Sequence, residues 1–201
     1  AVLHDPLPGE AENISLAAQK LCQTLVPAGS TFSQNQALGP YTLENGYQEG
    51  PSYAGDQVIT TVGGGICKIA SLLYNAAALA NLPILERHAH SMLVPYVPPG
   101  QDATVCYGAK DFRFANNLQT PLLIWCQKVD NTVYLAFYSQ QKAPVSFWQH
   151  QIKKYFPCQT LYQASSSLPA GWFGRLFNSV PNYYPGGSRT KPGTGSGPKL
   201  L

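Results

Sequence analysis

Apolar residues recur at helical spacing near the start of the chain, within residues 13–26. They lie three or four positions apart, as on one face of an α-helix, at Ile14, Ala17, Ala18, Leu21 and Leu25. Asn13 can cap such a helix with its side chain, and Pro27 cannot continue it. The pattern therefore predicts a first helix over residues 13–26.

A second helical pattern covers residues 66–80 and is apolar on almost every face. A run of three glycines at residues 63–65 precedes it. A helix that is apolar nearly all round is expected to be central and buried. Its polar exceptions, Cys67, Ser71 and Asn75, are spaced four apart and therefore share one face.

The other apolar segments are short and indicate strands. Residues 31–62 read as short strands and turns, a long irregular stretch of the kind that often covers a ligand. Six strand-like segments follow, at residues 83–90, 92–97, 103–107, 111–115, 121–128 and 132–138. Helices followed by a run of strands predict an α+β fold, in which the central buried helix, with a cysteine at its N-terminus, packs on a mostly antiparallel sheet.

Composition divides the chain of 201 residues into four parts. We expect an extended, proline-rich lead-in over residues 1–9 and one main domain over residues 10–140. Residues 141–164 are aromatic and amphipathic enough to form an extension that packs on this core. Residues 165–201 are rich in Ser, Gly and Pro, which predicts a flexible, disordered tail.

Charged residues make up only 11% of the chain, well below the roughly 25% of ordinary domains. Amide and hydroxyl side chains replace them, as is typical of secreted proteins. The net charge of +3 without a Lys/Arg cluster argues against a nucleic-acid partner. No apolar run approaches the ~18 residues of a membrane span. Because the chain begins at Ala1, we expect an extracytoplasmic protein whose only membrane contact is an N-terminal anchor lost upstream.

Cys67 stands in the first turn of the second predicted helix. The unpaired amides and partial positive charge of a helix N-terminus stabilise a thiolate and lower the pKa of a thiol. The preceding glycines allow close backbone approach, and amides near Gly65 and Cys67 can stabilise an oxyanion. The five cysteines have no CxxC spacing, so a zinc ribbon or a thioredoxin motif is not expected.

A histidine pair follows the second helix. On a strand, Glu86, His88 and His90 would point to the same side, and either imidazole could serve the thiol as general base. Asp102 is best placed to orient that imidazole, with Glu86 and Asp111 as alternatives. The order of cysteine, histidine and acid resembles papain-like folds of the transglutaminase and NlpC/P60 kind in architecture only.

Metal chemistry is a weaker interpretation of the same residues. His88 and His90 offer two nitrogens, and Cys67 or an acid could complete a tetrahedral site. Nothing else in the chain has metal-ligand spacing, so we expect neither a metal nor another cofactor.

Several unusual motifs occur in one order along the chain: PAGSTFSQNQALGPYTLENGYQEGP, VGGGICKIASLLYNAAALANLPILERHAHS and VPYVPPGQDATVCYGAKDFRFANN. They resemble the VanW family, which takes its name from an accessory protein of vancomycin-resistance clusters, and the resemblance covers about residues 10–138. The resemblance implies an extracytoplasmic setting in bacteria, with a membrane anchor or peptidoglycan-associated neighbouring domains. It implies no particular reaction.

Most candidate residues stand on motif positions of that family, but the chain departs from its pattern in places. Lys68 replaces a more frequent Gln beside the thiol, and Ala89 replaces a frequent Pro. Cys106 and Cys126 look particular to this chain, and a disulfide between them would be a local addition.

Our preferred hypothesis is a cell-envelope hydrolase or acyl transferase that acts on peptide or amide bonds such as those of peptidoglycan. The expected catalytic residues are Cys67, His88 or His90, and Asp102, and the expected substrate-binding residues are Gly63, Gly64, Gly65, Ser71, Asn75, Glu86 and Arg87. One alternative is a non-catalytic module that binds a cell-wall peptide or glycan. Another is a scaffold whose aromatic residues 145–177 dock a partner.

Overall fold

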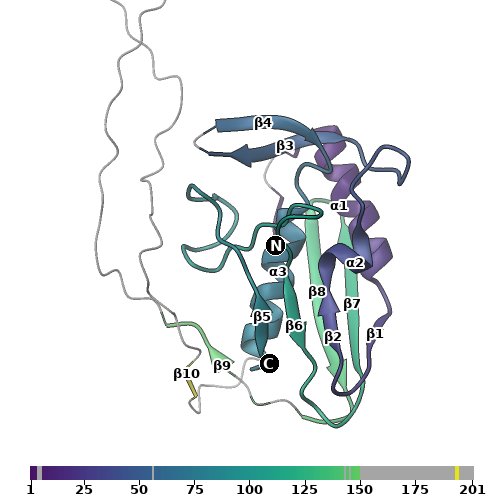
Figure 1. The fold of residues 1–201 in the computed structure, drawn as a ribbon, viewed down its shortest axis with the longest axis vertical. Helices are drawn as coiled ribbons and strands as arrows, with labels where there is room; N and C mark the ends of the chain where they lie inside the picture. Colours follow the sequence, from purple (N-terminus) through teal and green to yellow (C-terminus); the bar gives the residue numbers. More distant parts are fainter. Residues whose placement is uncertain (4–5, 56, 143, 145, 150–192, 195–201) are drawn as a thin grey trace, which may run out of the picture.

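The computed structural model describes residues 1–3, 6–55, 57–142, 144, 146–149 and 193–194. Helix α3 (Cys67–Leu79) lies in the middle of the fold, where it contacts helix α1 and strands β5, β8 and β9 (Figure 1). It matches the helix predicted over residues 66–80 to within one residue at each end, and its apolar side chains Ile69, Leu73 and Ala77 are fully buried. The central buried helix is therefore confirmed.

Every strand pairing in the described part of the chain is antiparallel. One sheet has the order β1-β7-β8, a second has the order β2-β6-β5, and β3 and β4 form a separate hairpin. The strands are β1 (Thr24–Val26), β2 (Thr31–Ser33), β3 (Glu49–Ala54), β4 (Gln57–Val62), β5 (Ile84–Glu86), β6 (Arg113–Ala115), β7 (Leu122–Val129), β8 (Thr132–Ser139), β9 (Ser146–Phe147) and β10 (Gly193–Thr194). The α+β class with antiparallel sheets is confirmed, although several small sheets replace a single one.

The first helix begins five residues earlier than predicted. Helix α1 (Pro8–Leu21) has a proline in its first turn, where the fixed φ of proline suits a helix start. It ends before Gln23, whose φ of 67° is left-handed, and the chain then joins β7 as strand β1. Asn13 is therefore a buried residue inside the helix and not its cap. A third helix, α2 (Gln34–Leu38), was not predicted.

Two of the predicted strand segments are wrong. Residues 92–97 form bends and turns, and residues 103–107 make only isolated bridges, from Thr104 to His88 and from Cys106 to Lys110. The segment predicted as a strand over residues 83–90 ends at Glu86 as strand β5. The chain between β5 and β6 is thus mostly irregular, and it carries the polar residues discussed below.

Three glycines form a backbone junction between α1, β3 and the turn before α3. A Cβ atom on Gly64 would lie 2.1 Å from the carbonyl carbon of Gly50, and one on Gly9 would lie 2.0 Å from the carbonyl oxygen of Glu49. Asn13 fastens the same junction, because its Nδ2 donates to the carbonyls of Gln48 and Gly64, each at 2.9 Å. The β3–β4 hairpin, which crosses the top of the ribbon in Figure 1, is therefore held directly against the start of α3.

The extension predicted over residues 141–164 is described only in part. Its strand β9 contacts α3, and the Trp148 ring lies 5.6 Å from the Tyr74 ring of that helix. The tail expected over residues 165–201 and the aromatic docking region at residues 145–177 lie almost wholly outside the described residues. Among the helices that the structure describes, none has the length and apolar character needed to cross a membrane.

Candidate active site

Cys67 is the first residue of α3, at the end of a glycine turn. Gly63 and Gly65 adopt φ values of +82° and +96°, a region that residues with a Cβ rarely enter. This turn places the thiol at the positive end of the helix, as the sequence predicted. The Cys67 amide donates no hydrogen bond to another described group, whereas the next amide, that of Lys68, is bonded to the Gly65 carbonyl at 3.0 Å.

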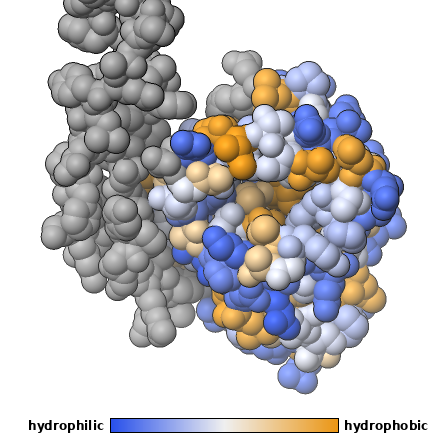
Figure 2. Space-filling view, turned by 45° about the horizontal axis from the view of Figure 1, so that its top comes forward, coloured by the Kyte–Doolittle hydropathy of each residue, from blue (hydrophilic) through white to orange (hydrophobic). Residues whose placement is uncertain are grey.

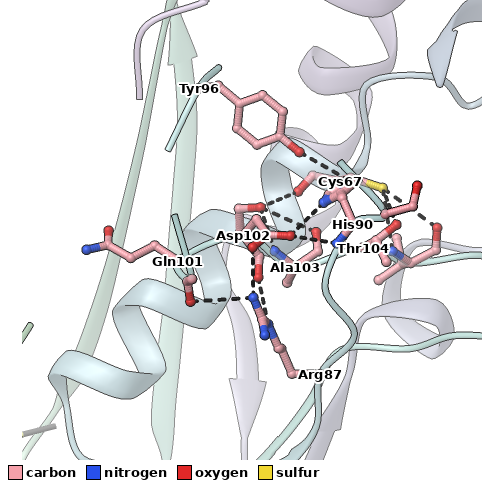
Figure 3. Close-up of polar contacts among 12 residues, drawn as sticks. Cys67, Arg87, His90, Tyr96, Gln101, Asp102, Ala103 and Thr104 are labelled. Atoms are coloured by element: carbon pink, nitrogen blue, oxygen red, sulfur yellow. Dashed lines mark hydrogen bonds and ion pairs between the residues drawn. The ribbon is translucent and has the colours of Figure 1, made fainter. Parts of the chain in front are cut away.

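The Cys67 sulfur lies against the segment that follows Asp102. The Thr104 hydroxyl is 3.4 Å from Sγ, and the Val105 amide donates to Sγ at 3.5 Å. The Val105 carbonyl lies 3.7 Å from the same sulfur. A hydroxyl and an amide are hydrogen-bond donors, so this environment can stabilise a thiolate. Figure 3 shows these contacts beside the His90 imidazole.

His90 and Asp102 form a buried pair next to the thiol. The imidazole Nδ1 lies 2.9 Å from Asp102 Oδ2, and the His90 amide donates to the same oxygen at 2.7 Å. His90 is only 7% exposed. The carboxylate thus fixes the imidazole orientation and leaves Nε2 to face the thiol, with which His90 also forms a hydrogen bond.

The Asp102 carboxylate is itself held from the far side by Arg87. Nη2 of Arg87 lies 2.8 Å from Oδ1, and Nε donates to the Asp102 carbonyl at 2.7 Å. The guanidinium also lies over the Tyr74 ring, 5.1 Å from its centroid. The structure therefore places Arg87, one of the predicted substrate-binding residues, behind the acid.

Ser71 and Asn75 share one helix face with Cys67 and hold the Asp102 segment on it. The Ser71 hydroxyl accepts from the Ala103 amide at 2.9 Å and donates to the Cys67 carbonyl at 2.9 Å. The Asn75 amide donates to the carbonyl of Gln101 at 2.8 Å. Neither residue is among those that line the cleft described below, and both hold the chain around Asp102 in place.

His88 and Glu86 are turned away from the thiol. His88 Nε2 lies 3.0 Å from Glu86 Oε1, and the Asp111 amide donates to that oxygen at 2.9 Å. Glu86 and His88 share a side as predicted, but His90 does not join them, because strand β5 ends at Glu86. The two imidazoles therefore do not converge on one point. Within the described residues, no group of three or more His, Cys, Asp or Glu side chains could hold a metal ion.

The electrostatics of the three residues favour a charged pair. Burial raises the pKa of Cys67, but the hydrogen bonds from His90, Thr104 and Val105 outweigh it and leave the pKa lowered. Burial lowers the pKa of His90, but Asp102 and Cys67 outweigh it and raise that pKa to about 9. The pKa of Asp102 is lowered despite burial, by hydrogen bonds from His90 and the charge of Arg87. The lowered pKa of Cys67 and the raised pKa of His90 both favour the form of the pair with a thiolate and an imidazolium.

Cys67 and His90 face a cleft of about 660 Å³. Gly63 and Gly65 line it, together with tyrosines from three separate segments: Tyr41, Tyr53, Tyr96 and Tyr107. The space-filling view, with the hairpin end turned forward, shows a hollow bordered by apolar residues (Figure 2). Lys68 also lines the cleft, where it forms an ion pair with Glu10 of α1. Lys68, which stands where a Gln is more frequent in the resembled family, is thus paired with a carboxylate from a helix that is distant in sequence.

The sequence interpretation missed several residues of this site, above all Tyr96 and Thr104. Tyr96 lies in the segment predicted as a strand over residues 92–97, and nothing in its local pattern indicates that its hydroxyl comes within 3.4 Å of His90 Nε2. The four described cysteines, Cys22, Cys67, Cys106 and Cys126, are free thiols. Cys106 lines the cleft and Cys126 is buried in β7, so the disulfide considered between them is not formed in this structure.

The chain matches a known protein family. The family model described as VanW like protein matches residues 9–138. The chain belongs to the VanW family. The VanW domain contains Cys67, His90 and Asp102, together with every strand from β1 to β7.

Two curated proteins are similar to this VanW domain. The uncharacterized protein YoaR of Bacillus subtilis (strain 168) is 41% identical over 129 residues, which are 64% of this chain and 43% of that protein. The vancomycin B-type resistance protein VanW of Enterococcus faecalis is 28% identical over 127 residues, which are 60% of this chain and 46% of that protein. The chain thus spans less than half the length of the curated relatives it matches. No solved structure matches the chain.

Proposed function

We propose that this VanW domain is a cysteine-dependent hydrolase or acyl transferase that acts on peptide or amide bonds in the bacterial cell envelope. One observation carries the proposal: the Cys67 thiol, the His90 imidazole and the Asp102 carboxylate follow one another in hydrogen-bond contact at the wall of a cleft. A nucleophile, a base and a group that orients the base are the parts that covalent acyl transfer requires.

In the first step, the Cys67 thiolate attacks the carbonyl carbon of a bound amide, and the carbonyl oxygen becomes an oxyanion. The Cys67 amide, which has no other acceptor among the described groups, lies at the helix start where it can donate to that oxygen. The His90 imidazolium then gives its Nε2 proton to the leaving amine as the carbon–nitrogen bond breaks. The acyl group remains on the sulfur as a thioester, and the imidazole is neutral.

In the second step, the neutral His90 Nε2 takes a proton from a water molecule or from an acceptor amine. The deprotonated acceptor attacks the thioester carbonyl, and the carbon–sulfur bond breaks to release the thiolate. Water gives a carboxylic acid and an amine gives a new amide, so hydrolysis and transfer differ only in the acceptor. Asp102 keeps Nδ1 occupied throughout, which fixes the tautomer that presents Nε2 to the reaction.

The substrate class and the location rest on the family. The name of the Enterococcus faecalis relative associates it with vancomycin resistance. The family resemblance implies an extracytoplasmic setting beside peptidoglycan, so peptidoglycan peptides are the substrates we propose for the cleft. A cleft lined by tyrosines, with a Glu10–Lys68 ion pair at its side, offers both apolar and polar contacts to such a peptide.

The pH dependence of Cys67 alkylation by iodoacetamide tests the proposal. We expect a thiol pKa below that of an ordinary cysteine, and a rise of that pKa in His90→Ala. His88→Ala is the matched control, because it removes an imidazole that contacts Glu86 instead of the thiol. A Cys67 thiol of ordinary pKa, unchanged in His90→Ala, would contradict the enzyme and favour a module that only binds cell-wall peptides or glycans.

A further inference from the structure

The charged side chains that line the cleft do not balance. Apart from the reacting pair of Cys67 and His90, the described residues that line it include two lysines, Lys68 and Lys110, and one acid, Glu10. Lys68 and Glu10 form an ion pair, so their charges cancel. The positive charge of Lys110 is left over, and the cleft is therefore cationic beside the reacting pair.

Lys110 presents this charge from a turn whose backbone is fixed. The Cys106 amide donates to the Lys110 carbonyl at 2.8 Å, and the Lys110 amide donates to the Cys106 carbonyl at 2.8 Å. Nδ2 of Asn35, in α2, donates to the same Lys110 carbonyl at 2.9 Å. Among the residues that the structure describes, no carboxylate forms an ion pair with the Lys110 ammonium. The ammonium is therefore available to an anion in the cleft.

Lys68 brings a second ammonium to the cleft, directly after the nucleophile in the chain. It pairs with Glu10 and lies over the Tyr96 ring, 5.5 Å from the ring centroid. Its side chain is 16% exposed, whereas that of Glu10 is 6% exposed. The cation is thus the more accessible member of the pair. An ammonium has three donors, and Glu10 accepts from one of them, so Lys68 can also donate to a bound anion.

We propose that the cleft selects substrates with a free carboxylate close to the carbonyl that Cys67 attacks, and that Lys110 and Lys68 recognise this carboxylate. The inference rests on the proposed function and narrows its substrate class. The carboxyl-terminal end of a peptide places a carboxylate one residue from the last amide bond. The terminal residue is then the leaving amine of the first step. An ammonium at a partly enclosed site attracts such an anion more strongly than one in open water does.

Iodoacetate and iodoacetamide are matched probes of this preference, because they differ in the carboxylate alone. Each forms a sulfur–carbon bond with Cys67 and releases iodide. Both rates depend in the same way on the fraction of thiolate, so their ratio in one variant at one pH does not depend on the pKa of the thiol. Mass spectrometry of the peptide that carries Cys67 measures both rates, because Cys106 in the same cleft is also a free thiol.

The ratio of the iodoacetate rate to the iodoacetamide rate should fall about threefold in Lys110→Gln, whose ammonium is solvent-exposed, and about tenfold in Lys68→Gln. It should rise in Glu10→Gln, because Lys68 then loses the carboxylate that competes with the probe. Opposite changes from the two halves of one ion pair cannot arise from lost stability alone. Lys128→Gln, which alters a lysine of β7 outside the cleft lining, should leave the ratio unchanged.

N-acetyl-trialanine and its carboxyl-terminal amide test whether a peptide end supplies the carboxylate. In excess, the acid should slow iodoacetamide alkylation of Cys67 more than the amide does, and Lys110→Gln should remove the difference. Equal effects of acid and amide would exclude the peptide end. An unchanged probe ratio in both lysine variants would overturn the carboxylate site and leave the proposed function standing. A Cys67 thiol of ordinary pKa would instead overturn the proposed function, and with it any role of the lysines in choosing a substrate.

Discussion

Replacement of Asp102 by Asn is the sharpest test of the charge arrangement, because it removes one charge and keeps the shape. The carboxylate accepts from His90 Nδ1 at 2.9 Å, in a hydrogen bond assisted by charge on both partners. Hydrogen bonds to charged groups contribute about 1.5–3 kcal/mol, and one pKa unit corresponds to about 1.4 kcal/mol. The pKa of His90, now raised to about 9, should therefore fall by roughly one to two units in Asp102→Asn.

The sign of the pH effect follows from the two titrations. The thiolate is present above the lowered pKa of Cys67, and the imidazolium is present below the pKa of His90 of about 9. The charged pair exists between these limits. Asp102→Asn lowers the upper limit, because the imidazolium loses its carboxylate partner. The pH window of the charged pair therefore narrows from the alkaline side.

Nuclear magnetic resonance of the imidazole nitrogens measures the pKa of His90 directly, and iodoacetamide alkylation measures that of Cys67. Asp130→Asn serves as the control, since Asp130 lies in a turn at a φ of 48°, which asparagine also tolerates. If the pKa of His90 in Asp102→Asn stays where it is in the unaltered chain, the buried carboxylate does not stabilise the imidazolium and our account of the site is wrong.

Three further substitutions test how the site is held in place. Asn13→Ala removes a fully buried side chain that makes three hydrogen bonds across the glycine junction. Urea titrations should show that the free energy of unfolding falls by about 3 kcal/mol. A fall of less than about 1 kcal/mol would contradict this role of Asn13. Gly64→Ala places a Cβ atom against backbone and should lower the free energy of unfolding by more than about 2 kcal/mol. In the control Gly29→Ala the Cβ atom meets open space, so the free energy of unfolding should fall by only about 1 kcal/mol, because of the positive φ. Equal melting temperatures of the two variants would show that the glycine junction is not tightly packed. Glu10→Gln leaves the Lys68 ammonium without its carboxylate partner and should lower the free energy of unfolding by about 1–3 kcal/mol. The same substitution at an exposed glutamate should lower it by less than about 0.5 kcal/mol. If Glu10→Gln lowers it no more than the exposed substitution does, the ion pair contributes nothing to stability.

The most predictable part of the structure is helix α3 with its cysteine. Its apolar residues repeat at a spacing that only a buried helix satisfies, and the glycines before it have local conformations that glycine alone adopts readily. The convergence of Cys67 with one histidine and Asp102 also follows from chain order, because the segment after the helix must return along it. The sequence could not choose between His88 and His90, since that choice depends on where strand β5 ends.

The roles of the buried polar residues could not be predicted, because their partners are distant in sequence. Asn13 is of a residue type that often caps helices, yet its side-chain amide donates to the carbonyl of Gly64, which lies 51 positions away. Ser71 and Asn75, two of the predicted substrate-binding residues, form hydrogen bonds with the chain at residues 101–103. Each is a polar side chain that satisfies the backbone of an irregular segment, and no local pattern records which segment that is.

The glycine junction limits where this domain can change length. At Gly9, Gly50 and Gly64, backbone packs on backbone with no room for a side chain, so each position must meet its neighbour in register. A residue inserted at the base of β3 would shift Gly50 away and bring a bulkier neighbour to the contact. A residue inserted at the hairpin tip, beside Gly55, would disturb nothing in that packing. Natural insertions and engineered tags should therefore be tolerated at the tip and rejected at the base.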